Sequence, residues 1–170
     1  GSVGLTVADL NRARDFYRDA VGLEVNDSEN GTARLGAGDT TLVELVEDPS
    51  APERPRHTSG LFHQAILVPS RADLAAALHR VVDAGWQLSG ASDHLVSEAL
   101  YLRDPEGNGI EIYRDRPREE WPVRDGTIQM STEPLDLEGV LGELRQEDVG
   151  KRMPPGTRIG HVHLSVGDLT

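Results

Sequence analysis

The spacing of apolar residues changes from strand-like to helix-like near the start of the chain. Residues 1–8 predict a short strand, and Asp9 can cap the helix that follows. The apolar positions of this helix recur at helical spacing: Leu10, Ala13, Phe16, Tyr17, Ala20 and Val21. Three short strands are expected next, over residues 23–26, 32–35 and 40–46. The pattern therefore predicts a strand, a helix and three more strands.

The same order of elements recurs after residue 60. Residues 61–68 predict a strand, and Ser70 with Asp73 resembles a capping box. The apolar face of the helix that follows contains Leu74, Leu78, Val81 and Val82, and Gly85 ends it. Strands are expected over residues 86–88, 99–103 and 109–113. The second half of the chain is thus predicted to repeat the first.

Alignment of the chain with itself supports this repeat. Residues 1–10 match residues 160–169, and residues 61–68 give a looser third copy. Counting back five residues from Val7, Val68 and Val166 gives three equivalent positions, occupied by Ser2, His63 and His161. Further along each unit, Glu44 and Glu111 are equivalent. Two histidines and two carboxylates therefore occupy corresponding places in a tandem βαβββ arrangement.

We expect five regions along the chain. A first βαβββ unit spans residues 1–48, a connecting loop 49–60, and a second βαβββ unit 61–115. Residues 116–157 form a polar linker with one short amphipathic helix, marked by Leu137, Val140, Leu141 and Leu144. Residues 158–170 are predicted to form the first strand of a third, truncated unit. Since one strand without partner strands has little reason to exist, we expect that the natural chain continues or that this is a fragment.

Composition narrows the classes of function. The chain has 170 residues and a net charge of −12, which argues against nucleic acid as a partner because phosphate binding needs clustered positive charge. It contains no cysteine, so His, Asp and Glu are the strong metal ligands that its side chains can offer. No apolar run is long enough to span a bilayer and no signal peptide is evident, so we expect no membrane partner and a cytoplasmic location.

One predicted hairpin carries the candidate chemistry. Its strands, residues 99–103 and 109–113, are joined by residues 104–107, whose Asp, Pro and Gly favour a tight turn. Glu111 lies between two isoleucines, which face the opposite side of the strand. If the isoleucines pack in an apolar layer, Glu111 points to the concave face of the sheet. A carboxylate there is costly unless a cation or a hydrogen-bond donor meets it.

Glu111 also closes a longer motif. In order, the motif contains His94, Leu100-Tyr101, Asp104-Pro105, Gly107 and Glu111. It resembles the signature of the extradiol ring-cleavage dioxygenases in the vicinal oxygen chelate superfamily, which includes glyoxalases and bleomycin resistance proteins. Ser92, two residues before His94, departs slightly from that signature. The His-x5-Leu-Tyr part is specific, whereas Asp-Pro-x-Gly recurs across the superfamily and supports the fold more than the chemistry. The resemblance implies an α+β fold in which tandem βαβββ units form curved mixed sheets around a cleft.

The resemblance also implies a metal site. In this superfamily the first and last strands of two units supply inward side chains to a shared cavity. Units two and three would offer His63, Glu111 and His161, the two histidines and one carboxylate of a non-haem Fe(II) centre. Mn(II) or another divalent metal would accept the same ligands. His163 lies on the same face as His161 by the strand period, and the repeat register favours His161 as the ligand.

Catalytic roles follow from the same resemblance. His94 would hydrogen-bond the bound oxygen or substrate and pass a proton, and Tyr101 would donate to a substrate oxygen. The substrates implied are a small aromatic diol of the catechol type and O2. The reaction would be dioxygenation of EC 1.13.11 type, in the degradation of aromatic compounds, and the truncated chain would be inactive alone.

Alternatives remain open at this stage. His63 could be an ordinary core histidine, Tyr101 a packed strand aromatic, and Glu44 either a vestige of a first-unit site or a polar cavity residue. The same fold supports glyoxalase-type metal-dependent isomerases and metal-free proteins that bind small molecules or confer resistance. The sequence also leaves open the ring substituents, a contribution from Ser2, and assembly as a homodimer.

Overall fold

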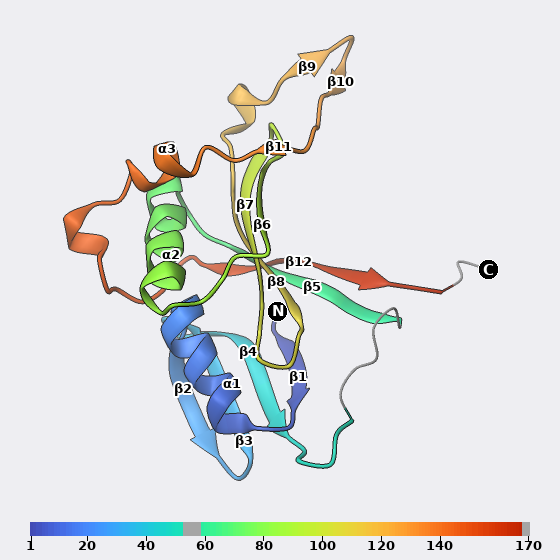
Figure 1. The fold of residues 1–170 in the computed structure, drawn as a ribbon. Coiled ribbons are helices and arrows are strands. Elements are labelled where there is room, and N and C mark those ends of the chain that lie inside the picture. The colour runs from blue at the N-terminus through green and yellow to red at the C-terminus, as the bar shows by residue number, and fades with distance from the viewer. Residues whose placement is uncertain (53–58, 168–170) are drawn as a thin grey trace.

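A computed structural model describes residues 1–52 and 59–167 and places their strands in two main sheets (Figure 1). The first sheet contains β1 (Val3–Val7), β2 (Glu24–Glu29), β3 (Thr32–Ala37) and β4 (Thr40–Glu47), in the order β1-β4-β3-β2. Strand β1 runs parallel to β4, and the other two pairs are antiparallel. This is the strand connectivity predicted for the first repeat.

The second sheet uses the same connectivity and is larger. Its strands are β5 (Gly60–Leu67), β6 (Gly90–Asp93), β7 (Ser97–Arg103), β8 (Gly109–Asp115), β11 (Glu133–Pro134) and β12 (Arg158–Ser165), in the order β11-β6-β7-β8-β5-β12. Strand β5 runs parallel to β8, as β1 does to β4. Strand β12, which the sequence predicts to open a third repeat, adds to this sheet antiparallel to β5. The predicted α+β fold of tandem units with mixed sheets is confirmed.

One helix follows the first strand of each unit. In the first unit, α1 (Leu10–Phe16) starts at Asp9, whose side chain accepts from the Arg12 N–H, and continues as a π-helical turn from Tyr17 to Val21. Gly22 ends it with a φ of 94°, a conformation that costs glycine least. In the second unit, α2 (Arg71–Asp83) begins with the predicted capping box, in which the Ser70 hydroxyl accepts from the Asp73 N–H.

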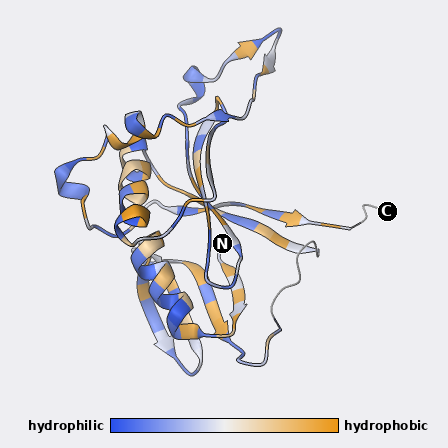
Figure 2. Cartoon of the chain, in the orientation of Figure 1, coloured by the Kyte–Doolittle hydropathy of each residue, from blue (hydrophilic) through white to orange (hydrophobic). Residues whose placement is uncertain are grey.

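The apolar faces of both helices and both sheets share one core. Buried residues from α1, β3 and β4 belong to the same cluster as residues from α2 and β8. Figure 2 shows hydrophobic residues along α1, α2 and the strands beside them, and hydrophilic residues over much of the segment after β8. The two repeats therefore stabilise each other by burying a common apolar surface.

The segment of residues 116–157 contains more structure than the single helix expected. The helix is present as α3 (Leu137–Leu141), capped by Asp136. It is accompanied by 3-10 turns at Arg118–Glu120 and Gln146–Asp148 and by the small hairpin of β9 (Val123–Arg124) and β10 (Thr127–Ile128). Figure 1 shows this hairpin extending away from the sheets. Strand β11 returns to pair with β6, so the segment completes the edge of the second sheet.

One predicted strand is wrong. Residues 86–88 form no strand, and the first strand after α2 is β6, at Gly90–Asp93. Trp86 instead packs its ring 4.6 Å from that of Phe16 and donates its indole N–H to the Arg103 carbonyl oxygen. Its apolar character thus serves a contact between the two units. Within the described residues, no helix combines the length and apolar character that a membrane span requires.

Candidate metal centre

Three side chains that could bind a metal ion come from three neighbouring strands and meet at one point of the second sheet. His63 comes from β5, Glu111 from β8 and His161 from β12 (Figure 1). The Glu111 Oε2 atom lies 3.0 Å from His63 Nε2 and 3.2 Å from His161 Nε2. The two Nε2 atoms are 3.2 Å apart. The structure thus brings together all three residues expected to bind a metal.

Local strand geometry produces this convergence. Ile110 and Ile112 are almost fully buried in the core on one face of β8, which directs Glu111 to the opposite face. The parallel pairing of β5 with β8 sets His63 opposite Gly109. A Cβ atom on Gly109 would overlap the Phe62 carbonyl oxygen, so glycine permits the close approach of these strands.

The third residue arrives through a shift in strand register. Strand β12 pairs Ile159 with Ile66 and His161 with Ala65, so Gly160 is the extra residue. The Tyr113 hydroxyl fills the place where a Cβ on Gly160 would lie, and the Tyr113 ring is centred 5.4 Å from that of His161. Gly160 therefore lets β12 pack over Tyr113 beside the ligand atom of His161.

Burial favours the neutral form of both inner residues, His63 and Glu111. Removal from water, helped by the neighbouring His161 and His163, lowers the pKa of His63 to about 4, so its imidazole is neutral at physiological pH. Burial raises the pKa of Glu111, although His161 and Tyr101 oppose that effect. A neutral imidazole beside a carboxylate with restricted hydration offers lone pairs to a metal ion rather than an ion pair of its own.

The distances and the donor set fit a metal ion. Two atoms bound at about 2.1 Å and at right angles to each other lie about 3.0 Å apart, close to the separations found here. Glu111 is 5% exposed, and no Lys or Arg within residues 1–52 and 59–167 forms an ion pair with it. A carboxylate buried in this way needs a compensating cation or proton. Among the described residues, no other group of three or more His, Asp or Glu side chains lies close enough together to share a metal ion.

Tyr101 and His94 are connected to the cluster by hydrogen bonds, Tyr101 to Glu111 and His94 to Tyr101. The Tyr101 hydroxyl oxygen lies 3.3 Å from Glu111 Oε1 and 2.9 Å from His94 Nε2. On its other side, His94 Nδ1 is 2.9 Å from the Ser131 carbonyl oxygen. Burial raises the pKa of Tyr101, and the Glu111 carboxylate adds to the effect, so its phenol is protonated. Both predicted catalytic residues therefore lie on the metal-site face.

The Ser131 carbonyl defines the state of His94. A carbonyl oxygen can only accept, so Nδ1 carries a proton and, in the neutral ring, Nε2 is an acceptor facing Tyr101. Ser131 lies just before β11 in the segment expected to be a polar linker. The contact uses a backbone atom that every residue type possesses, so no sequence signal could have identified it.

Apolar side chains line the sheet next to these polar groups. Ala65, Leu67, Ala99 and Tyr113 form a small buried cluster on the metal-site face, with Tyr101 packed against it. The cluster limits hydration of the adjacent carboxylate, which strengthens electrostatic interactions at the site.

The remaining candidates lie outside the three-residue cluster. Glu44, the repeat equivalent of Glu111, is paired with Arg34 at 3.0 Å, and Ser2 is exposed. His163 is exposed, and its ring is centred 5.0 Å from that of His63 and 4.8 Å from that of Phe62. The first-unit carboxylate is therefore satisfied by an arginine, and His163 flanks the cluster.

Comparison with protein families identifies the superfamily of this chain. Residues 1–112 match the Glyoxalase/Bleomycin resistance protein/Dioxygenase superfamily model. The chain belongs to this superfamily, as the motif ending at Glu111 indicates.

Two relatives carry dioxygenase names. The chain is 45% identical over 172 residues to the catechol-2,3-dioxygenase of Bacillus subtilis (strain 168), a match that covers 99% of the chain and 60% of the relative. It is 35% identical over 95 residues to the biphenyl-2,3-diol 1,2-dioxygenase 3 of Rhodococcus globerulus, covering 51% of the chain and 50% of that protein. The chain thus spans between half and two thirds of the length of these relatives.

A solved structure supports the fold. The crystal structure of a glyoxalase/dioxygenase from Nostoc punctiforme superposes with a TM-score of 0.58 at 20% identity, covering 68% of this chain and 90% of that one. At this identity the similarity concerns the fold alone.

Proposed function

We propose that the natural protein is an extradiol dioxygenase, which inserts O2 into the ring of a catechol-type diol at a non-haem Fe(II) ion held by His63, Glu111 and His161. The observation that carries this proposal is the convergence of two histidine nitrogens and one carboxylate oxygen within 3.2 Å of one another. The similarity to a catechol-2,3-dioxygenase supports the same reaction class. Mn(II) is the second metal that this ligand set accommodates.

The protein residues would bind and orient the diol and handle its protons. Bound Fe(II) supplies the redox chemistry with O2 that side chains cannot provide. Tyr101 would donate its hydroxyl proton to a substrate oxygen, at the position from which it now contacts Glu111. His94 would accept a proton at Nε2 and return it later, because an imidazole does both near neutral pH.

The experiment combines metal analysis with an activity assay. The natural-length protein is loaded anaerobically with Fe(II), and metal content is measured after gel filtration, together with O2 uptake on a panel of catechols. We expect one iron per site and a yellow ring-opened semialdehyde acid. Glu111→Gln should remove the bound iron, because two histidines alone rarely retain Fe(II) against buffer.

The first repeat offers a matched control. Glu44→Gln makes the same chemical change at the equivalent position, where Arg34 rather than a metal meets the carboxylate, so iron content and activity should be retained. Full iron content in Glu111→Gln would reject the ligand assignment. Isomerisation of a thiol–aldehyde adduct without O2 uptake would replace this proposal with the glyoxalase-type alternative, and binding of an aromatic ligand without metal would favour a binding protein.

A further inference from the structure

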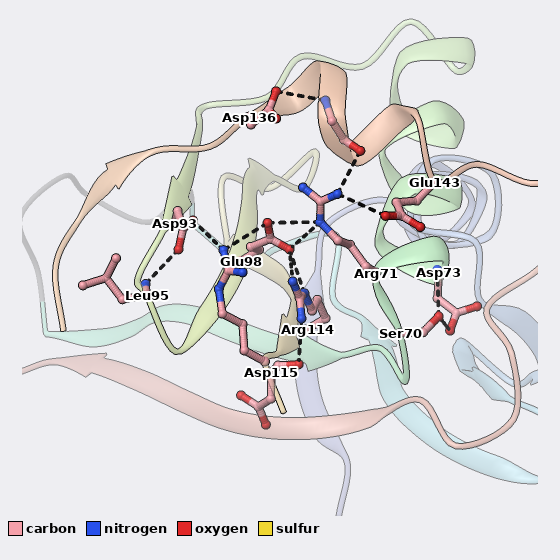
Figure 3. A network of polar contacts seen from close by, with 12 residues as sticks. Ser70, Arg71, Asp73, Asp93, Leu95, Glu98, Arg114, Asp115, Asp136 and Glu143 are labelled. Atoms are coloured by element: carbon pink, nitrogen blue, oxygen red, sulfur yellow. Dashed lines mark hydrogen bonds and ion pairs between the residues drawn. The ribbon is translucent and has the colours of Figure 1, made fainter. Parts of the chain in front are cut away.

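We propose that Asp93 and Arg116 are positioning residues that fix the imidazole of His94 through a charge network anchored on the buried Glu98. This inference rests on the proposed role of His94 as proton carrier. It goes beyond that role, because neither Asp93 nor Arg116 contacts the metal cluster, that is, His63, Glu111 and His161. Figure 3 shows most of the network, which joins α2, α3 and strands β7 and β8 to the turn between β6 and β7.

The turn that carries His94 has an unfavourable backbone. His94 follows β6 directly, and its N–H donates to the Ser97 carbonyl oxygen at 2.8 Å. The next residue, Leu95, has a φ of 69°, a left-handed conformation that a leucine rarely adopts. Such a conformation persists only when the surrounding structure enforces it. The carboxylate of Asp93 does so by accepting from the Leu95 N–H at 2.8 Å.

Arg116 in turn holds that carboxylate. Its Nη2 atom lies 2.6 Å from Asp93 Oδ2 and 3.4 Å from Glu98 Oε1. Its backbone N–H also donates to the Val96 carbonyl oxygen at 2.8 Å, inside the same turn. Arg116 therefore stabilises the turn through both its side chain and its backbone.

Glu98 makes the network rigid. It is 2% exposed, and its carboxylate receives Arg114 at 2.6 Å and Arg71 at 2.9 Å. Burial alone would raise the pKa of Glu98, but the hydrogen bonds from Arg71 and Arg114 outweigh it and hold the pKa below its usual value. Arg71 also donates to the Gly139 carbonyl oxygen in α3 and contacts Glu143. Removing one partner from a buried set of this kind leaves an uncompensated charge.

The arrangement of Arg116 is not the one that stability alone would favour. Its Nε–H group is buried and has no hydrogen-bond partner in the described part of the chain. An unpaired buried donor costs about 1–3 kcal/mol. The guanidinium thus contacts Asp93 and Glu98 while its Nε–H group stays without a partner in the described part of the chain. Such a local cost in stability is expected where a residue positions a functional site.

Two supports therefore converge on His94 from separate parts of the chain. Its ring nitrogen Nδ1 faces the Ser131 carbonyl oxygen, and its backbone is set by the turn that Asp93 closes. Together they direct Nε2 toward the Tyr101 hydroxyl at 2.9 Å. A small rotation of the turn would break this contact while leaving the three metal ligands in place.

The test compares Asp93→Ala and Asp93→Asn in the natural-length, Fe(II)-loaded protein. Asparagine keeps an acceptor for the Leu95 N–H and loses the charge, so it protects folding and should have the smaller effect. In Asp93→Ala we expect kcat to fall about ten- to a hundredfold, the cost typical of a displaced catalytic group, with KM and iron content unchanged. Arg116→Ala should behave similarly, and Arg116→Lys should recover part of the loss.

A second measurement does not depend on activity. In the metal-free wild type, the ring 15N shifts of His94 at neutral pH should report a single tautomer protonated at Nδ1, and Asp93→Ala should give a mixture of tautomers. Asp27→Asn is the matched control, because it removes an aspartate–arginine ion pair of the first unit, and it should alter neither readout. Wild-type kcat and a single tautomer in Asp93→Ala would overturn the proposal, as would an equal loss of iron and activity. If the wild type lacks dioxygenase activity, the proposed function fails, and the 15N shifts still decide the positioning role.

Discussion

A single phenolic proton lies between two acceptors at the edge of the metal cluster. The Tyr101 hydroxyl can donate either to Glu111 Oε1 at 3.3 Å or to His94 Nε2 at 2.9 Å, but not to both. The shorter contact favours His94 in its neutral form. When the ring takes up a proton, Nε2 becomes a donor and the phenol is free to turn to Glu111 or to a substrate oxygen. Under the proposed function, these three residues would provide a short path for one proton.

This arrangement predicts different effects for the two side chains. Under the proposed function, His94→Ala removes the group that would carry the proton, so turnover should slow by about 10² or more. Tyr101→Phe removes one hydrogen bond and should cost about tenfold or less. Steady-state kinetics on the iron-loaded protein would measure both, with iron content as the control. Equal losses in the two variants would contradict the assignment of His94 as the proton carrier.

Gly160 provides a second test at the level of single residues. A Cβ at this position would overlap the Tyr113 hydroxyl oxygen, and Tyr113 is itself 9% exposed and unable to move freely. Gly160→Ala should therefore displace β12 at the adjacent His161 and weaken iron binding by about tenfold or more, as loss of a support next to a ligand typically does. Iron titration would measure the change.

A smaller side chain at position 113 should offset the effect of Gly160→Ala. Adding Tyr113→Leu to Gly160→Ala removes the overlapping ring and should recover part of the iron affinity. Gly4→Ala, on the first strand of the other unit, is the control, since nothing lies within 4 Å of a Cβ built there. Unchanged iron affinity in Gly160→Ala would mean that β12 accommodates the methyl group without moving His161.

The sequence predicted those site residues whose side-chain type and position in a strand indicate their role. Glu111 could be placed because its isoleucine neighbours define the buried face of the strand, and His63 and His161 because the repeat gives them one register. The Ser131 carbonyl and the bonds of Asp93 could not be found in this way. They depend on a backbone atom and on arginines distant along the chain, which no local pattern specifies.

At the scale of elements, patterns with a clear period predicted the structure and the others did not. The helices and most strands lie where the spacing of apolar residues predicted them. Asp9 and Ser70 cap α1 and α2, as expected. Strand β6 has the sequence Gly-Ala-Ser-Asp, with no strand preference of its own, and exists because it pairs with β7 and β11. Residues 86–88 appeared strand-like because Trp86 is apolar, whereas its ring is used for a contact between units.

A buried polar contact joins the first helix to the hairpin turn before Glu111. The Tyr17 hydroxyl, in the π-helical turn, donates to Asp104 Oδ2 at 3.1 Å and accepts from Gln64 Nε2 at 2.8 Å. Asp104 also caps its own turn, by accepting from the Glu106 and Asn108 N–H groups. The first unit thereby holds the turn that positions β8.

Tyr17→Phe should destabilise the protein without touching the metal cluster. The change leaves the Gln64 amide without its buried acceptor and takes one donor from Asp104, a loss of about 1–3 kcal/mol. Thermal unfolding should show a midpoint lower by about 2–12 °C. Iron content at low temperature should stay the same, and an unchanged midpoint would show that water replaces the hydroxyl.

At the scale of the whole molecule, one arginine connects three regions of the chain. Arg80, on α2, is 8% exposed and donates to the Val21 carbonyl oxygen at 3.3 Å and to the Lys151 carbonyl oxygen at 2.8 Å. The Met153 N–H donates to the Gly22 carbonyl oxygen at 2.7 Å in the same place. The segment that leads into β12 is therefore fastened to the end of the first-unit helix by way of the second unit.

This connection predicts that a change far from the cluster weakens it. Arg80→Met keeps the apolar stem and removes both donors, so two carbonyl groups lose their partners and the unfolding free energy should fall by about 1–3 kcal/mol. Burial lowers the pKa of Arg80 to about 10, so the guanidinium is charged at neutral pH and its two bonds are charge-assisted. Because β12 begins at Arg158, loosening of residues 151–157 frees the strand that carries His161. Hydrogen exchange over residues 149–165 should therefore accelerate and iron affinity should fall, whereas exchange in β7 and β8 should stay as in the wild type. Uniform acceleration over the whole chain would instead mean that Arg80 supports only the common core.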